Sequence, residues 1–201
     1  MSKKHGVLAV FSGPSGSGKG TVLARAMEKD KNIVISVSVT TRNPREGEVD
    51  GVNYYFRTKD EFLKMISENG LIEWAQFCEN YYGTPREMVE KCLEEGKNVI
   101  LEIEVQGAMK VRESYPEAVL IFNLPPSTKV LRERLVGRNT ESQEVIEKRL
   151  KTAEWELSQA EKYDYIIVND DIDVAVDEFL AVLKAEKCKT NRNSKLLKEF
   201  C

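Results

Sequence analysis

The sequence predicts an α/β fold: a three-layer core around a central parallel sheet, with an inserted mixed α+β subdomain and a small helical lid. Three observations support this prediction. Short β-branched runs alternate with helical patterns, which is typical of parallel sheets with crossover helices. A glycine-rich turn follows the first apolar run, and a polar segment punctuated by Pro and Gly interrupts the alternation after residue 40. The length of 201 residues and the hydrophobic content of 41% suit one substantial core.

Five short apolar runs are the predicted strands of the core sheet. A T-x-x-E capping box at Thr58 and Glu61 opens one predicted helix. The same box at Thr84 and Glu87, with Pro85 as the first helical residue, is predicted to open another. The strands span residues 7–11, 33–39, 99–105, 119–124 and 165–168. The helices span residues 20–29, 58–70, 84–96, 127–136, 142–162 and 172–187.

The order of these elements predicts one domain with two additions. Its core covers about residues 1–38, 97–133 and 163–187, and an insertion covers about residues 39–96. A lid is expected at about residues 134–150, where a polar turn follows an arginine-rich helix. The basic segment 188–201 is poorly patterned, and we expect a frayed tail without an assigned function.

The stretch FSGPSGSGKGT, residues 11–21, has the spacing of a phosphate-binding loop (P-loop), Gly13-x4-Gly18-Lys19. It lies between a predicted strand and a predicted helix, which is the context that such a loop needs. Successive backbone N–H groups, the Lys19 ammonium and the positive end of the helix favour bound phosphate. We therefore expect ATP to bind at Gly13, Pro14, Ser15, Gly16, Ser17, Gly18, Lys19, Gly20 and Thr21.

Gly20 departs from the common form of this loop. The residue after the lysine is usually Ser or Thr, whose hydroxyl binds Mg²⁺. Here the hydroxyl comes one residue later, at Thr21. Because Mg²⁺ keeps several waters, it can be held mainly by phosphates and water, with help from Thr21. The pattern favours a small kinase whose substrates supply most of the metal's ligands.

A second phosphate site separates a kinase from a nucleotide triphosphatase. Arg42 and Arg45 lie three residues apart in TTRNPR and can form a fork around a phosphate. Tyr54 and Tyr82 can donate phenolic hydroxyls to the same group. These four residues favour a kinase with a phosphorylated acceptor.

Several longer segments then point to a family. GPSGSGKGT, TTRNPREGEVDGVNYYF, EWAQFCENYYGTP, EIEVQG, RLVGRNTES and IVND occur in the order and at the intervals that resemble guanylate kinases, over about residues 7–183. The resemblance implies a Mg²⁺-dependent transfer of the γ-phosphoryl group from ATP to GMP, and to dGMP, which gives ADP and GDP. The transfer would be in line and need no general base, because the acceptor is already an ionised phosphate.

The resemblance also implies roles for residues of the insertion. Arg42, Arg45, Tyr54 and Tyr82 would bind the GMP phosphate, with Ser38 beside them. Glu73 would accept hydrogen bonds from guanine N1–H and N2–H₂, and Thr84 would contact O6. Glu102, where the family motif has Asp, and Glu104 would share one face of the strand end, near GMP or a metal-bound water.

The predicted lid carries the remaining charges. Arg134 and Arg138 lie four apart on one helical face, and Arg149 follows on the next helix. The resemblance implies that these three arginines surround the transferring phosphoryl group, and that Asn169 in IVND belongs to the adenine pocket. Lys19, Arg42 and the three lid arginines are thus the expected catalytic residues.

Composition narrows the alternatives. The net charge of -3 argues against a protein that coats nucleic acid, and the single histidine, His5, argues against a His-dependent triad. Four scattered cysteines predict neither a zinc site nor disulfides, and we expect a cytoplasmic protein with no membrane segment, as a monomer or homodimer. A kinase for another small phosphate acceptor, and a guanylate-kinase-like module that binds phosphopeptides, remain as alternatives.

Overall fold

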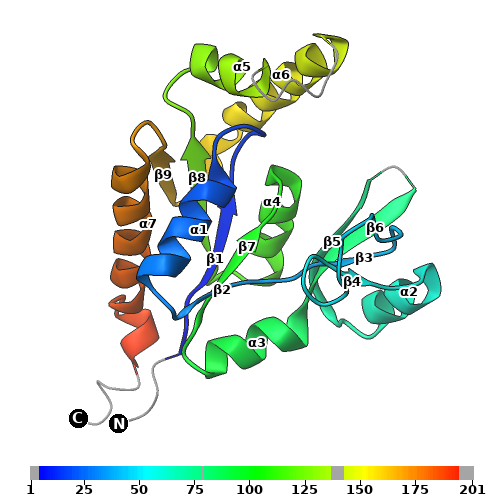
Figure 1. The fold of residues 1–201 in the computed structure, drawn as a ribbon. Helices are drawn as coiled ribbons and strands as arrows, with labels where there is room; N and C mark the ends of the chain where they lie inside the picture. The colour runs from blue at the N-terminus through cyan, green and yellow to red at the C-terminus, as the bar shows by residue number, and fades with distance from the viewer. Residues whose placement is uncertain (1–4, 78, 137–142, 195–201) are drawn as a thin grey trace.

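A five-stranded parallel sheet forms the centre of the computed structural model, which describes residues 5–77, 79–136 and 143–194 (Figure 1). The strands run in the order β2-β7-β1-β8-β9. In β1, Ala9 pairs with Ile100 of β7 on one side and Val119 of β8 on the other. The predicted α/β class is therefore confirmed. The strands are β1 (Leu8–Ser12), β2 (Ile33–Ile35), β7 (Asn98–Glu102), β8 (Val119–Leu124) and β9 (Tyr165–Val168).

Helices cover both faces of this sheet and make the three predicted layers. Helices α1 (Lys19–Lys29) and α7 (Ile172–Lys187) pack on the face that carries Ala9 and Phe11. Helices α3 (Arg86–Glu94) and α4 (Val105–Ser114) lie on the face that carries Leu8 and Val10. Successive side chains of a strand point to opposite faces, so a run of buried residues in β1 fills both cores.

The insertion forms a second sheet beside the core, in the order β4-β3-β6-β5 (Figure 1). Strands β3 (Val39–Thr40) and β4 (Tyr55–Phe56) are parallel, whereas β6 (Asn80–Pro85) is antiparallel to both β3 and β5 (Leu71–Phe77). Helix α2 (Lys59–Ser67) buries Phe62 against Val39 and Leu71. The capping box of Thr58 and Glu61 opens α2 as predicted.

Several predicted boundaries are wrong, three of them in the core strands and at the start of α3. The expected strand 33–39 is divided between the two sheets, because the chain leaves the core after Ile35 and enters the second sheet at Val39. The expected strand 99–105 ends at Glu102, and the unpredicted helix α4 begins at Val105. Pro85 is the N-cap of α3 rather than its first residue. The Thr84 hydroxyl does not close a capping box there, because it donates to Glu73 instead.

Two further helices stand at the carboxyl end of the core sheet, α5 (Thr128–Val136) and α6 (Gln143–Ser158) (Figure 1). Leu131 and Leu135 of α5 pack against Ala153 of α6. The expected helix 142–162 is shorter than predicted, because a 3₁₀ turn, η1 (Ala160–Lys162), follows α6. Among the described residues, no helix is both long and apolar enough to span a membrane.

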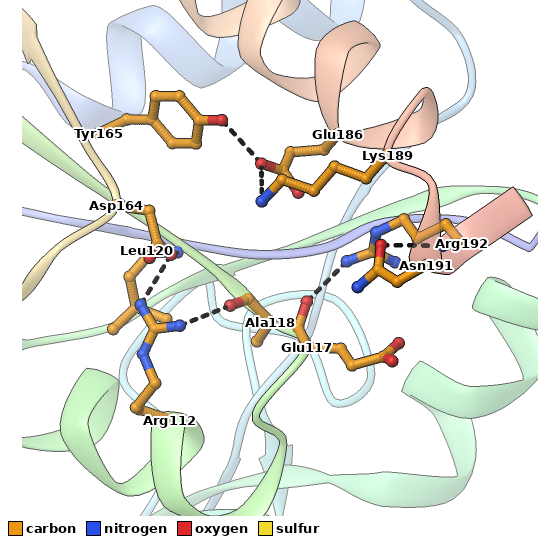
Figure 2. Close-up of polar contacts among 10 residues, drawn as sticks. All are labelled: Arg112, Glu117, Ala118, Leu120, Asp164, Tyr165, Glu186, Lys189, Asn191 and Arg192. Atoms are coloured by element: carbon orange, nitrogen blue, oxygen red, sulfur yellow. Dashed lines mark hydrogen bonds and ion pairs between the residues drawn. The ribbon is translucent and has the colours of Figure 1, made fainter. Parts of the chain in front are cut away.

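The segment after α7 is anchored at the opposite end of the sheet (Figure 2). Glu186, only 1% exposed, accepts a hydrogen bond from the Tyr165 hydroxyl at 2.8 Å and pairs with Lys189 at 2.7 Å. Beyond it, in the 3₁₀ turn η2 (Asn191–Asn193), Arg192 donates to the Glu117 carbonyl at 2.6 Å. The expected frayed tail is therefore ordered as far as Ser194, the last described residue.

Candidate active site

Residues 13–19, here called the phosphate loop, join the end of β1 to the start of α1. Gly13, Gly16 and Gly18 have positive φ angles of 143°, 88° and 90°. A Cβ on Gly13 would lie 2.3 Å from the Asn123 carbonyl oxygen, and one on Gly18 would lie 2.4 Å from the Asn169 amide nitrogen. Glycine is therefore required at both positions, for its backbone angle and for its size.

Side chains from three separate elements hold the loop through one carbonyl, that of Ser17. The amide nitrogens of Asn123 in β8 and of Asn169 after β9 each donate to it at 2.8 Å. Arg134 of α5 donates to the same oxygen at 3.4 Å and to the Asn169 carbonyl at 3.2 Å. The shape of the loop is thus set in advance by the core. Asn123 was not among the predicted site residues, because a lone Asn in an apolar strand has no motif around it.

Lys19 crosses the loop from the first turn of α1. Its ammonium donates to the carbonyls of Gly13 at 2.5 Å and Pro14 at 3.2 Å. Gly20 follows it on an exposed turn, where an added Cβ would meet no atom within 4 Å. The arrangement gathers a cation and a helix N-terminus on one side of the loop, which is a setting for bound phosphate.

A pocket of about 380 Å³ opens beside the phosphate loop. Thr21 and Asn169 line it, as do three residues that the sequence did not single out, Arg25, Asp170 and Ile172. The Asn169 amide donates its hydrogen bond to the Ser17 carbonyl of the loop and also lines the pocket. Its predicted contact with adenine stays a prediction. The pocket is lined by Gly16, Gly18, Thr21, Arg25, Arg134, Asn169, Asp170 and Ile172.

The predicted lid arginines approach the loop from two helices. Arg134 reaches it from α5 through Ser17 and Asn169, as described above. Arg149 of α6 donates to the Ser15 hydroxyl at 3.3 Å. Arg138 lies outside the described residues, so its predicted role stays a prediction. The structure brings two of the three arginines to the loop that they are expected to serve.

A cluster between the β3–β4 connection and β6 contains the predicted phosphate fork. The Arg42 guanidinium lies 5.5 Å from the centre of the Tyr54 ring, and the Tyr54 and Tyr82 rings are 6.2 Å apart. Glu48, which the sequence did not reveal, pairs with Arg42 at 2.9 Å and accepts from the Arg45 backbone N–H at 2.7 Å. The hydrogen bond from Arg42 lowers the pKa of the Glu48 carboxyl. Glu48 thus holds the turn that carries both arginines.

Ser38 stands at the edge of this cluster. Its carbonyl accepts from the Tyr55 backbone N–H at 2.8 Å, which attaches β4 to the segment before β3. Its backbone therefore has a structural role in the second sheet, and a contact with a ligand phosphate stays a prediction.

Glu73 and Thr84 form a buried pair between β5 and β6. Glu73 is 7% exposed and Thr84 is 1% exposed, and the Thr84 hydroxyl donates to the Glu73 carboxylate at 2.7 Å. Burial raises the pKa of Glu73, whereas the Thr84 hydrogen bond and the positive charge of Lys110 lower it. One hydroxyl satisfies only part of a carboxylate's accepting capacity, so this pair is suited to a ligand edge that donates hydrogen bonds.

Glu102 and Glu104 do not share a strand face. Strand β7 ends at Glu102, and Glu104 is the N-cap of α4. The alternation argument therefore fails beyond Glu102, although both side chains are exposed at the carboxyl end of the sheet.

A carboxyl that the sequence analysis missed lies on α6. Glu156 is 7% exposed, and its burial raises its pKa to about 7. The positive charge of Lys19 lowers that pKa and the negative charge of Glu104 raises it, so Glu156 is close to both groups. The available signal was its position on the apolar stripe of α6, beside Ala153 and Leu157.

The donor atoms of this site fit a weakly protein-bound Mg²⁺. The residues at hand are the Thr21 hydroxyl and the exposed carboxylates of Glu102 and Glu104. Within residues 5–77, 79–136 and 143–194, no group of three or more His, Cys, Asp or Glu side chains could hold a metal ion. A hard oxygen-ligated ion that keeps its waters and binds phosphates is compatible with such a site.

Comparisons with known proteins agree with this architecture. The family model described as guanylate kinase matches residues 5–186. Over 194 residues the chain is 53% identical to the guanylate kinase of Caldanaerobacter subterraneus subsp. tengcongensis, covering 96% of this chain and 94% of the relative. It is 50% identical to that of Bacillus anthracis over 201 residues, which cover 100% of this chain and 98% of the relative.

A solved structure is similar to this chain in both fold and sequence. The crystal structure of guanylate kinase from Anaplasma phagocytophilum superposes with a TM-score of 0.75 at 41% identity, over 94% of this chain and 90% of that one. The glycine loop, the buried Glu73–Thr84 pair and the cluster around Arg42 thus occur in a chain that belongs to the guanylate kinase family.

Proposed function

We propose that the chain has guanylate kinase activity and transfers the γ-phosphoryl group of ATP to GMP, and to dGMP, giving ADP and GDP. The observation that carries the proposal is the buried Glu73 carboxylate beside the Thr84 hydroxyl. A carboxylate only accepts hydrogen bonds, and the guanine edge donates from both N1–H and N2–H₂, whereas adenine has no N1–H. The activity serves purine nucleotide metabolism and GMP recycling.

On the donor side, the phosphate loop and Lys19 would hold the ATP phosphates. Lys19 would exchange its contacts with loop carbonyls for phosphate oxygens. Arg134, Arg138 and Arg149 would surround the transferring group with positive charge as the lid closes. Asn169 and the pocket that it lines would take the nucleoside part of ATP.

On the acceptor side, Arg42 and Arg45 would form the fork for the GMP phosphate, with hydroxyls from Tyr54, Tyr82 and Ser38. The bond that breaks joins the γ-phosphorus to the ADP oxygen, and the bond that forms joins it to a GMP phosphate oxygen. The acceptor oxygen is already ionised, so no side chain has to remove a proton. Alignment and charge neutralisation supply the catalysis.

Mg²⁺ is the proposed cofactor. When bound, it would neutralise charge on the ATP phosphates. Thr21 and Glu102 would hold its water ligands, and Glu104 would line the acceptor side. The donor set described above supports an ion carried mainly by phosphates and water.

The setting of the reaction is also part of the proposal. We assign residues of about 39–96 to a GMP-binding subdomain, about 134–150 to the lid, and the remainder up to residue 187 to the core. One chain carries both nucleotide sites, so a monomer or a homodimer would serve. We place the reaction in the cytoplasm, where ATP and GMP are found, with neither nucleic acid nor membrane as a partner.

A coupled assay of ADP formation tests the proposal. Purified chain, ATP and Mg²⁺ are mixed in turn with GMP, dGMP, AMP and UMP. We expect turnover with GMP and dGMP, and kcat/KM at least about 10³-fold lower with AMP and UMP, because the buried carboxylate would be left unpaired. Comparable turnover with AMP would overturn the assignment, as would absent turnover accompanied by tight binding of a phosphopeptide.

A further inference from the structure

Lys110 connects α4 to the peptide next to Glu73. Its ammonium donates to the Trp74 carbonyl oxygen and lies 5.1 Å from the centre of the Trp74 ring. A cation against an aromatic face is attracted to it, so the two contacts reinforce each other. An exposed lysine of the core thereby contacts the second sheet one residue beyond the carboxylate that the proposed function assigns to guanine.

A wider contact between α4 and β5 surrounds this lysine. The Ser114 hydroxyl donates to the Ile72 carbonyl at 2.8 Å, so α4 binds the backbone on both sides of Glu73. A Cβ added to Gly107 would lie 3.3 Å from a Glu73 carboxylate oxygen. Residues 107, 110 and 114 share one face of the helix. That face therefore fixes the strand at two carbonyls and leaves room for the carboxylate between them.

The charge of Lys110 also acts on Glu73. Burial holds the pKa of Glu73 above its ordinary value, and two groups offset part of that rise: the Thr84 hydroxyl from β6 and the Lys110 ammonium from α4. A protonated Glu73 would present a donor to guanine N–H groups, whereas the ionised form accepts from both. Guanine binding thus depends on groups that keep this buried carboxyl ionised.

We propose that Lys110 is a positioning residue for guanine recognition, which fastens the Trp74 carbonyl to α4 and keeps the Glu73 side chain in its accepting form. The inference rests on the proposed function and deepens it. Lys110 acts through Glu73, so it affects the affinity for the base and not the transfer step.

Three substitutions separate its two contributions. Lys110→Arg keeps the charge and a donor, Lys110→Gln keeps a donor without charge, and Lys110→Met keeps neither. We expect Lys110→Gln to raise the KM for GMP about two- to fivefold, the size of a solvent-exposed charge contact. Lys110→Met should raise it further, whereas Lys110→Arg should stay close to wild type. The KM for ATP, and kcat at saturating GMP, should not change.

The pH profile supplies a readout that a structural role would not change. GMP binding falls as pH drops through the pKa of Glu73, and removal of a positive charge raises that pKa, so the decline should begin at higher pH in Lys110→Gln. The ratio of its KM to the wild-type KM should therefore grow as the pH is lowered from alkaline to acidic values. The GMP phosphate also titrates near pH 6, but its effect is common to both enzymes and cancels in the ratio.

Ser114→Ala is the matched control, because it removes the neutral hydrogen bond from α4 to β5. It should lower the melting temperature without a pH-dependent change in the KM ratio. A constant KM ratio for Lys110→Gln across the pH range, with wild-type preference for GMP intact, would overturn this inference alone. Wild-type enzyme that uses AMP as well as GMP would overturn the proposed function and this inference with it.

Discussion

The phosphate loop and the proposed acceptor site, here the residues Arg42, Arg45, Tyr54, Glu73, Tyr82 and Thr84, are built in different ways. The loop is one continuous stretch, and its backbone shape is held by Asn123 and Asn169 through a single carbonyl. The acceptor site draws Glu73, Tyr82 and Thr84 from β5 and β6, and its other side chains from the connection between the two-residue strands β3 and β4. Substitutions in the phosphate loop change its backbone shape as a whole. A substitution in the acceptor site removes one side chain and leaves the others in place.

Among these variants, Lys19→Ala should show the largest difference between its effect on kcat and its effect on GMP binding. Removal of a charge that neutralises the transferring phosphate should lower kcat about 10²- to 10³-fold. The dissociation constant for GMP, measured by calorimetry, should change less than about twofold, because Lys19 belongs to the loop alone. Lys29→Ala, which removes a surface ion pair with Asp177, is the control and should leave kcat unchanged. A near-normal kcat for Lys19→Ala would refute the role of the loop.

Glu156→Gln tests the charge balance beside the loop. The folded-state pKa of about 7 exceeds the ordinary 4.5, so the folded chain holds a proton that the unfolded chain has released. Wild-type stability from this group therefore falls as pH rises from 4.5 to 7 and stays low above 7. The variant lacks this loss and should be more stable by about 2 kcal/mol at about pH 8.

Urea unfolding at several pH values measures this difference. The exposed neighbour Glu154, changed to Gln, is the control and should give a difference that does not depend on pH. A pH-independent difference for Glu156→Gln as well would show that folding does not shift the pKa of this carboxyl.

Gly20→Ala should have the smallest effect. Its Cβ would enter open space at the start of α1, and loss of glycine's freedom in the unfolded chain should stabilise the protein by about 0.5 kcal/mol. We expect kcat within about twofold of wild type, because the added Cβ contacts no other group. Gly13→Ala, whose Cβ would lie 2.3 Å from a backbone oxygen, should instead be strongly destabilised. A large loss of activity in Gly20→Ala would contradict our account of this position.

The same contrast explains what the sequence could predict. The phosphate loop and its strand and helix were predictable, because spacing and backbone freedom are local properties. The capping box at Thr58 was predictable for the same reason. Thr84 has an identical local signal, yet its hydroxyl donates to Glu73, which is eleven residues away in the chain. The Thr84 hydroxyl therefore makes a tertiary hydrogen bond instead of the local capping bond to residue 87. That partner follows only from the pairing of β5 with β6.

Other features of the site depend on contacts between distant segments. The predicted strand 99–105 runs into the first residue of α4 because Ile103 and Val105 continue the apolar pattern of β7, and the rest of α4 is not predicted. Lys110 and Glu48 have ordinary sequence surroundings, and their contacts arise from the second sheet lying against the core and from the turn before β4. The family resemblance supplied Glu73 and Thr84, which composition and periodicity alone would not have selected.

The central claim is that a buried carboxylate selects guanine, and Glu73→Gln tests it most directly. Gln has the same shape but turns one acceptor into a donor that faces the N–H groups of guanine. We predict that the KM for GMP rises about 10²-fold or more, while the KM for ATP changes less than about twofold. An equal rise in both constants, or none in either, would contradict the account.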